Sequence, residues 1–282
     1  MTGDDATTFR GWVRPGPRPP GASSLPEVPA DETLDYISGY FRLFQLRDGH
    51  RFSTDDVLTA WYGTSWCPTA GAILDLGSGI GSVATIAAWR LTGARLVTVE
   101  AQPASVALAR KSARYNGIDD RCDIREGDFR TPGVLDAAER FDLVLGSPPY
   151  FPVGSGVEGD HPQKVACRFE LRGDIRDYCR TAADHLAGGG IFATVFPLPD
   201  GQHARMLSAA SEAGLSILRM RPVVLRDGAA PLLGLFVLMR GLDLPPDQRA
   251  ATWTEPALVI RTASGAVHPE YSAIKLAFGF PP

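Results

Sequence analysis

The segment Ala72-Ile73-Leu74-Asp75-Leu76-Gly77-Ser78-Gly79-Ile80-Gly81 joins a short apolar run to a glycine-rich turn. The apolar run predicts a strand, and glycines after it let the backbone approach a ligand and adopt positive φ. A helix expected to begin near Ser82 adds exposed N–H donors and a partial positive charge. The spacing is Gly-x-Gly-x-Gly, because Ser82 stands where dinucleotide-binding enzymes carry their last glycine. The segment therefore predicts a strand–turn–helix unit that holds a ligand, with a purely structural turn as the alternative.

Strands and helices alternate on both sides of this unit. Strands are expected at residues 72–76, 95–100, 123–126, 141–145, 191–196, 215–225 and 232–239. Helices are expected near 54–62, 82–91, 103–116, 133–138, 175–186 and 202–213. Such alternation predicts a parallel, doubly wound α/β sheet with right-handed crossovers. The short polar link 226–231 predicts that the last two strands form an antiparallel hairpin at one edge. The expected fold is a mostly parallel, seven-stranded, Rossmann-like sheet.

The chain divides into an extension and one domain. Residues 1–30 are rich in proline, with glycine, serine and acidic residues, so we expect a mobile, disordered extension. Residues 31–282 are expected to form a single domain. Within it, 31–70 is a helical and loop segment covering the ligand site, 71–240 is the core, and 241–282 is a C-terminal extension.

Composition limits the class of protein. The chain has 282 residues, is 44% hydrophobic and carries a net charge of −4. No apolar run approaches the roughly 18 residues of a membrane span, and the N-terminus lacks the basic start and apolar block of a secretory signal. We expect a cytoplasmic protein without a membrane partner. The cysteines form no Cys-x-x-Cys pair and have no histidine at ligand spacing, so no metal site is expected.

The negative net charge also bears on nucleic-acid binding. Dedicated nucleic-acid binders are usually basic, because neutralising phosphates supplies much of their affinity. Any RNA binding by this chain must therefore rest on local clusters. The candidates are Arg42, Arg47 and Arg51, and, at helical spacing, Arg168, Arg172, Arg176 and Arg180. A solvated helix face balanced by neighbouring acidic residues explains the second cluster equally well.

Ser147-Pro148-Pro149-Tyr150 follows the expected strand 141–145. Two prolines cannot donate to a sheet, so the strand must end there, and the chain continues as a rigid extended turn. This hook presents the Ser147 hydroxyl, backbone carbonyls and the Tyr150 ring at the carboxyl edge of the sheet, where ligands of open α/β folds bind. A planar amino group could lie against the ring and donate hydrogen bonds to these oxygens. An ordinary proline turn is the alternative.

Acidic residues end the neighbouring strands. Glu100 could accept both hydroxyls of a ribose, and Asp128 could accept from an adenine amine while Phe129 covers the ring. Each could also be an ordinary surface residue. Asp75 would repel phosphate and suit an ammonium group. The combination indicates S-adenosylmethionine rather than NAD.

With these motifs the chain resembles class I S-adenosylmethionine-dependent amino-methyltransferases that carry Asn/Asp/Ser-Pro-Pro-Tyr. The segments 49–55 (GHRFSTD) and 147–151 (SPPYF) followed by 154–156 (GSG) are similar to bacterial tRNA(Val) adenine-N6 methyltransferases, over roughly residues 36 to 240 and more faintly around Tyr271. The resemblance implies a catalytic hook of Ser147, Pro148, Pro149 and Tyr150. It implies cofactor binding by Phe52, Thr54, Asp55, Asp75, Gly77, Ser78, Gly79, Gly81, Glu100, Asp128 and Phe129. One departure is Ser147, where the tRNA enzymes usually carry Asn.

The expected activity is methyl transfer to an exocyclic amino nitrogen, foremost adenine N6 in tRNA or another structured RNA. A protein glutamine or a small-molecule amine is an alternative acceptor, favoured by the acidic net charge and the scarcity of lysine. A second alternative is a non-catalytic cofactor-binding subunit, for which Ser147 is the only hint. The sequence leaves the oligomeric state open.

Overall fold

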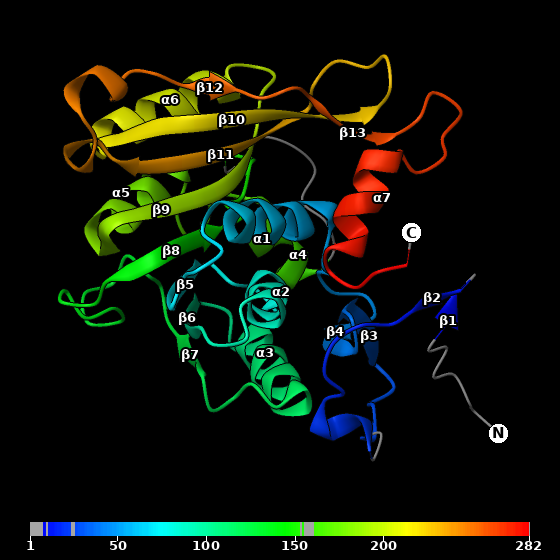
Figure 1. The fold of residues 1–282 in the computed structure, drawn as a ribbon. Coiled ribbons are helices and arrows are strands. Elements are labelled where there is room, and N and C mark those ends of the chain that lie inside the picture. Colours follow the sequence, from blue (N-terminus) through cyan, green and yellow to red (C-terminus); the bar gives the residue numbers. More distant parts are fainter. Residues whose placement is uncertain (1–7, 10, 24–25, 153, 155–160, 282) are drawn as a thin grey trace.

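The computed structural model describes residues 8–9, 11–23, 26–152, 154 and 161–281. Its core is a nine-stranded sheet with the order β12-β10-β11-β9-β8-β5-β6-β7, in which β13 also pairs with β10 (Figure 1). The predicted strands are β5 (Ala72–Leu76), β6 (Arg95–Glu100), β7 (Cys122–Glu126), β8 (Phe141–Gly146), β9 (Leu186–Pro197), β10 (Leu215–Arg226) and β11 (Leu233–Arg240). The prediction of a doubly wound, mostly parallel α/β fold is confirmed.

The sheet is parallel from β7 to β9 and antiparallel where β11 meets its neighbours. The hairpin of β10 and β11 forms as predicted, but it is not the outer edge of the sheet. Two short strands from the C-terminal segment, β12 (Trp253–Thr254) and β13 (Leu258–Arg261), pair in parallel with β10. They cover part of a strand that would otherwise present unpaired backbone groups.

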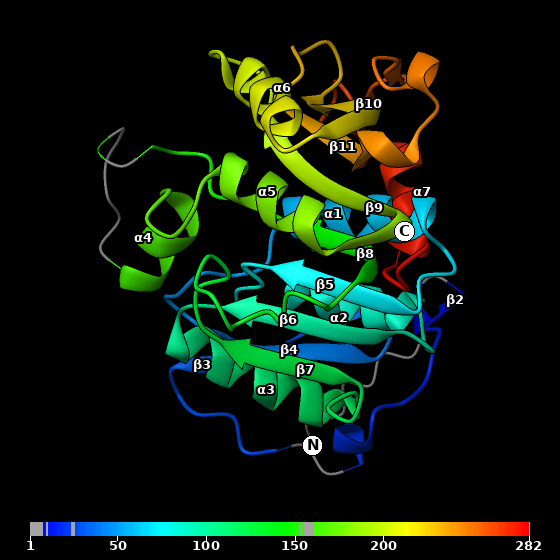
Figure 2. The same cartoon turned by 90° about the vertical axis from the view of Figure 1, so that its left-hand side faces the viewer.

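Helices cover both faces of the sheet (Figure 2). One face carries α1 (Thr54–Trp66), α2 (Ser82–Arg90) and α3 (Pro103–Asn116), and the other carries α5 (Ile175–His185) and α6 (Gln202–Glu212). Each face has its own buried apolar cluster. The predicted ends hold for α3, which begins at Pro103 and closes at Gly117 with φ 65°. The helix predicted at 133–138 is wrong, because those residues form turns.

The segment 31–70 differs from its prediction as helix and loop. Before α1 it forms a hairpin of β3 (Glu32–Ser38) and β4 (Phe41–Leu46). The hairpin packs on α3, where Phe44 N–H donates to Ser112 Oγ at 2.9 Å and Asn116 pairs with the backbone of Arg42. The sequence did not indicate this pairing, because a tight turn at 39–40 separates two short and unevenly patterned runs. After it, Ser53 caps α1 in a capping box with Asp56.

Described segments near both ends of the chain contact the rest of the domain. The described part of the proline-rich segment includes β2 (Trp12–Val13), which pairs with β1 (Thr8–Phe9), and a turn of 3₁₀ helix, η1 (Pro20–Ala22), that packs on α3. Arg14 donates to the carbonyl of Gly39 at 2.7 Å. The mobility expected for residues 1–30 stays a prediction, although these residues make contacts. At the other end, 3₁₀ turns η2 (Gly241–Asp243) and η3 (Pro246–Gln248) precede β12, and α7 (Pro269–Leu276) packs on β13.

No helix in the described part of the chain is long and apolar enough to cross a membrane.

Candidate active site

The carboxyl ends of four adjacent strands meet beside a cavity of about 700 Å³. The register aligns these ends, since Leu76 of β5 lies opposite Val99 of β6 and Gly146 of β8, and Glu100 lies opposite Glu126 of β7. The volume suits a nucleoside-sized ligand. Most predicted site residues line it: Asp55, Asp75, Gly77, Ser78, Gly79, Glu100, Asp128, Phe129, Ser147, Pro148, Pro149 and Tyr150.

The glycine loop needs its glycines for two different reasons. Gly77 and Gly79 have φ of 61° and 55°, in the left-handed region that side chains disfavour. A Cβ on Gly77 would lie 2.1 Å from the hydroxyl of Tyr178, which is buried beneath the loop, whereas a Cβ on Gly79 would meet nothing within 4 Å. Gly77 therefore lets the loop pack downward, and Gly79 leaves open space above it. Gly81 caps α2 and is not among the cavity-lining residues.

Two buried carboxylates support the loop from below. Glu100 is 6% exposed, and its carboxylate accepts from Gly79 N–H at 2.9 Å and Gln102 N–H at 2.7 Å. Asp75 is 1% exposed and accepts from Ala84 N–H at 3.1 Å. Burial raises the pKa of both, and that of Asp75 stands well above its usual value. Acidic groups at this loop disfavour a phosphate ligand and suit hydroxyl and ammonium donors.

Asp128 and Phe129 lie at the far end of the cavity. Arg130 holds the Asp128 carboxylate through bonds of 2.9 and 2.6 Å, and its hydrogen bonds lower the pKa of Asp128. The Phe129 ring meets Tyr178 edge-on, with centroids 4.8 Å apart. The structure thus brings both residues to the predicted place, and Asp128 already has an arginine partner there.

Tyr150 is fixed from three sides. Its hydroxyl donates to Asp55 Oδ2 at 2.9 Å, its ring meets Phe196 of β9 edge-on at 5.9 Å, and its carbonyl accepts from Gln202 Nε2 at 3.2 Å. Burial and the Asp55 carboxylate raise the pKa of Tyr150 well above its usual value, so the phenol stays neutral. The nearby Ser147 side chain acts on that pKa in the opposite direction. The hook is therefore a rigid element with Ser147 and Tyr150 close together.

The segment before β5 contributes less than expected. Of Phe52, Thr54 and Asp55, only Asp55 lines the cavity. Phe52 packs against the apolar core, and the Thr54 side chain interacts with Tyr271 of α7. Neither residue therefore faces the cavity, because the Phe52 side chain is held in the core and the Thr54 side chain is held by α7.

Gln163 joins the two sides of the cavity mouth. It lies on α4 (Pro162–Arg168), is buried, accepts from His50 N–H at 2.8 Å and donates to Ser105 Oγ of α3 at 2.9 Å. A Cβ on Gly49 would meet its amide oxygen at 2.2 Å, so Gly49 is needed for this close approach. The contact fastens α4 to the loop before α1. Sequence reasoning missed Gln163, because an isolated glutamine in a glycine-rich loop carries no signal.

Tyr178 was also missed. It forms the floor of the cavity between the loop of Gly77 and the end of β8, where a Cβ on Gly146 would lie 2.8 Å from its ring. The only signal is its place on the buried face of α5, which marks it as a core residue and no more.

Cationic side chains surround the mouth of the cavity. They are Arg47, Arg51, Lys164, Arg168 and Arg172. Arg51 pairs with Asp35 at 2.8 Å, while the other four form no ion pair among the described residues, although Arg172 interacts electrostatically with Glu100 and Asp128. The predicted cluster of four arginines at helical spacing divides, because Arg176 and Arg180 of α5 pair with Glu212 and Asp177. Within the described residues, no group of acidic, histidine and cysteine side chains could hold a metal ion.

These groups fit S-adenosylmethionine. The space above Gly79 is open for a ligand backbone, the carboxyl groups of Asp75 and Glu100 would accept from hydroxyl and ammonium donors, and Phe129 lines the same cavity.

Comparison with known proteins gives a consistent result. Residues 62–167 match the family model of the methyltransferase small domain. The chain is 30% identical to the tRNA1(Val) (adenine(37)-N6)-methyltransferase of Shewanella amazonensis over 72% of this chain and 85% of that protein. It is 29% identical to the enzyme of the same name from Porphyromonas gingivalis, over 78% and 85%. A solved structure described as a predicted O-methyltransferase from Agrobacterium tumefaciens shares the fold, with a TM-score of 0.59, 20% identity and coverage of 81% and 98%.

Proposed function

This chain belongs to the family of tRNA1(Val) (adenine(37)-N6)-methyltransferases, and we propose that it methylates the N6 amino group of an adenine in tRNA. It is an S-adenosylmethionine-dependent methyltransferase. The observation that supports the proposal most is the position of the hook. Ser147, Pro148 and Tyr150 share one cavity with Asp75, Gly79 and Glu100, so a cofactor on the glycine loop and an amine on the hook would lie in the same space.

The cofactor supplies an electrophilic methyl group on a sulfonium. The acceptor is a poor nucleophile, because the lone pair of an exocyclic amine is delocalised into the ring. Ser147 Oγ and the Pro148 carbonyl would accept hydrogen bonds from its N–H groups and favour the sp³ geometry needed for attack. As the new N–C bond forms and the bond to sulfur breaks, positive charge develops on the nitrogen, and the same oxygens stabilise it more strongly than in the ground state. The nitrogen then loses a proton to water.

Tyr150 would orient the base. A ring held at its hydroxyl by Asp55 and at its backbone by Gln202 cannot turn with the substrate, so stacking on it fixes the direction of approach. Such positioning is worth a large part of the rate in a reaction that needs no strong base. Base–aromatic stacking contributes roughly 1–3 kcal/mol per base.

Serine at position 147 is compatible with this role. The Ser147 side chain lies near the phenol of Tyr150, and its hydroxyl oxygen would accept a hydrogen bond from the amine. An amine that donates hydrogen bonds would then be preferred over a carbonyl that accepts them.

The cations at the cavity mouth would bind the phosphates next to the target nucleotide. Arg47, Lys164 and Arg168 form no ion pair with a carboxylate among the described residues, so little competes with a phosphate for them, whereas Arg172 also interacts electrostatically with Glu100 and Asp128. This concentrates positive charge at the site in a chain whose net charge is −4. Contacts of this kind position an RNA without reading its sequence.

The activity is tested by incubating the protein with labelled S-adenosylmethionine and, in parallel, total tRNA, total protein and a metabolite extract. The proposal expects label in tRNA, and N6-methyladenosine after digestion to nucleosides. Label confined to the protein fraction would indicate a glutamine acceptor, and label confined to the extract would indicate a small-molecule amine. Either outcome would refute the RNA assignment.

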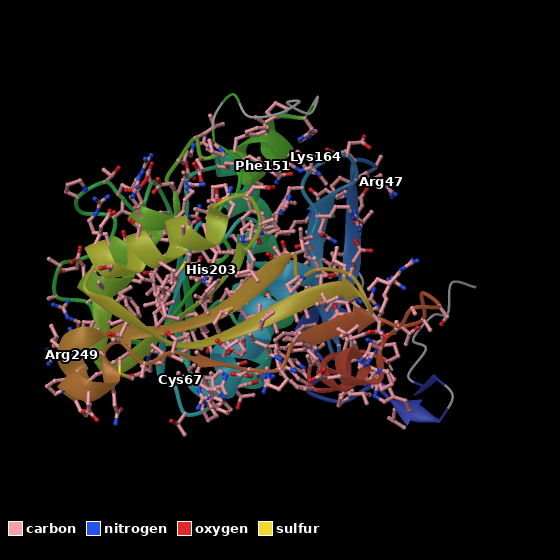
Figure 3. The ribbon with its side chains drawn as sticks, turned by 90° about the horizontal axis from the view of Figure 1, so that it is seen from above. Arg47, Cys67, Phe151, Lys164, His203 and Arg249 are labelled. Carbon is pink, nitrogen blue, oxygen red and sulfur yellow. The ribbon has the colours of Figure 1, made fainter. Side chains whose placement is uncertain are left out.

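The phosphate contacts are tested with Lys164→Ala and Arg168→Ala. Arg249→Ala is the matched control, because Arg249 is exposed and lies far from the cavity mouth (Figure 3). Each phosphate contact contributes about 0.7 to the slope of log K against log salt for single strands and about 0.9 for duplex. We expect each test variant to lower the slope for tRNA binding by that amount and the control to leave it unchanged. Equal slopes in all proteins would place the RNA on another surface.

A further inference from the structure

We propose that Phe151 is a stacking platform for the nucleotide adjacent to the target base. The proposal rests on the proposed function, because it assigns a second base of the same RNA to the mouth of the same cavity. Phe151 directly follows the hook, lines the cavity and is 47% exposed. An exposed aromatic ring on the wall of a ligand cavity offers its face to a planar group of the ligand.

The Phe151 backbone is held firmly despite this exposure. Its N–H donates to the carbonyl of Arg168 at 3.1 Å, and its carbonyl accepts from Glu170 N–H at 2.9 Å. These two bonds form a parallel bridge to Phe169, whose buried ring lies 5.9 Å from that of Phe151. The exposed ring is therefore fixed in place before any ligand arrives, which lowers the entropy lost on binding.

A second set of contacts fixes the bridge itself. Arg205 of α6 pairs with Glu170 at 2.6 Å and donates to Gln202 Oε1 at 2.9 Å, and Gln202 holds the Tyr150 carbonyl. The same group of side chains thus positions both aromatic residues. Tyr150 reaches inward to Asp55, while the next ring along the extended chain is exposed. Two adjacent aromatic rings in this arrangement suit two adjacent bases, one inside the cavity and one at its mouth.

The positive charges beside Phe151 indicate the kind of partner. Lys164 and Arg168 are four residues apart on α4, which places them on one face of the helix, and both line the cavity with Phe151. Figure 3 shows Phe151 and Lys164 on the same side of the molecule, with Arg47 beyond them. An exposed ring flanked by cations is the combination by which proteins hold single-stranded nucleic acid, with bases on the ring and phosphates on the cations. A peptide segment around a glutamine has no regular anionic backbone to match these cations.

The test measures binding of a short, labelled, single-stranded oligoribonucleotide with one central adenosine, in the presence of S-adenosylhomocysteine. Four proteins are compared: wild type, Phe151→Ala, Phe151→Trp and Leu207→Ala. Leu207 is the matched control, because it is 48% exposed on α6 and does not line the cavity. Stacking energies predict a roughly 5- to 150-fold loss of affinity in Phe151→Ala. Phe151→Trp should keep the wild-type affinity, and Leu207→Ala should match wild type.

The decisive comparison uses two further oligonucleotides, each with an abasic residue on one side of the adenosine. One of them should weaken binding to wild type by the same factor and leave binding to Phe151→Ala unchanged. A purely structural role of Phe151 would lower the affinity for every oligonucleotide alike and would not be restored by tryptophan. If both abasic substitutions weaken all proteins equally, or Phe151→Ala binds like Leu207→Ala, the inference is wrong.

The test separates this inference from the proposed activity. Binding that depends on Phe151 without any methyl transfer to tRNA would refute the activity and keep the platform. Methyl transfer to tRNA with unchanged affinity in Phe151→Ala would refute the platform and keep the activity. If circular dichroism shows that Phe151→Ala does not fold, Phe151→Leu replaces it, since leucine fills the space without a stacking surface. The affinities of wild type and Phe151→Leu for the abasic oligonucleotides then test the inference.

Discussion

Alanine at Gly77 and at Gly79 should separate folding from cofactor binding. Both glycines have positive φ, so each alanine costs about 1–2 kcal/mol of backbone strain. At Gly77 the new methyl group would also lie 2.1 Å from the hydroxyl of Tyr178. Tyr178 cannot retreat, because its ring is buried between Phe129 and the end of β8. Overpacking of this kind adds about 1–3 kcal/mol.

The two variants should therefore differ in stability. We expect Gly77→Ala to lose roughly 2–5 kcal/mol and Gly79→Ala roughly 1–2 kcal/mol. For a chain of this length about 2 °C of Tm corresponds to each kcal/mol. Thermal and urea denaturation without ligand measure the difference, and equal losses would show that Tyr178 does not support the loop.

Cofactor binding should show a second contrast. The methyl group of Gly79→Ala would enter the open space of the cavity, where a bound S-adenosylmethionine would meet it. We expect its Kd for S-adenosylmethionine, from calorimetry at a temperature where the variant is folded, to rise at least about tenfold. Unchanged affinity in Gly79→Ala would refute the placement of the cofactor on this loop.

Three other variants test neighbouring parts of the site. Burial raises the pKa of Asp56 to about 6 from 3.8, so the protonated side chain stabilises the fold fully below pH 3.8, and this contribution is lost as pH rises through 6. Between pH 4 and 8 the free energy of unfolding of wild type should fall by up to about 3 kcal/mol relative to that of Asp56→Asn. A difference between the two proteins that stays constant with pH in urea denaturation would refute this. Tyr150→Phe leaves the half-buried Asp55 carboxylate without its 2.9 Å donor, so kcat for tRNA should fall about tenfold while the ring remains to stack. An unchanged kcat would show that this hydrogen bond does not contribute to catalysis. Gln202→Ala frees the Tyr150 carbonyl, and should lower kcat several-fold with the same Kd for S-adenosylmethionine; a changed Kd would mean that Gln202 acts on the whole cavity.

The core of the fold could be predicted because its signals are local. Alternating apolar runs, Pro103 at a helix start and Gly117 after its end mark elements without knowledge of their neighbours. The carboxyl ends of parallel strands must meet, so residues that follow those strands come together, as Glu100 and Tyr150 do. The β3–β4 hairpin and the added strands β12 and β13 depend on pairing with distant segments, and their short sequences carry no such signal.

The site residues that depend on backbone conformation could be predicted from the sequence. Those that depend on packing between distant segments could not. Glycine permits positive φ and proline fixes φ, so the loop at Gly79 and the hook at Pro148 could be assigned from residue type alone. Phe52 and Thr54 belong to a motif, yet Phe52 packs on the core and Thr54 contacts Tyr271, so neither lines the cavity. Tyr178 and Gln163 act through contacts with residues far along the chain, at Gly77 and His50, that only the folded structure brings together.

A crystal structure with S-adenosylmethionine bound is the most direct measurement of where the chemistry takes place. We predict a ligand whose amino-acid end lies at Asp75 and Gly79, whose ribose contacts Glu100, whose adenine lies by Phe129, and whose methyl group faces Ser147. A ligand bound elsewhere, or one in this cavity with its methyl group directed away from Ser147 and Tyr150, would contradict the proposed active site.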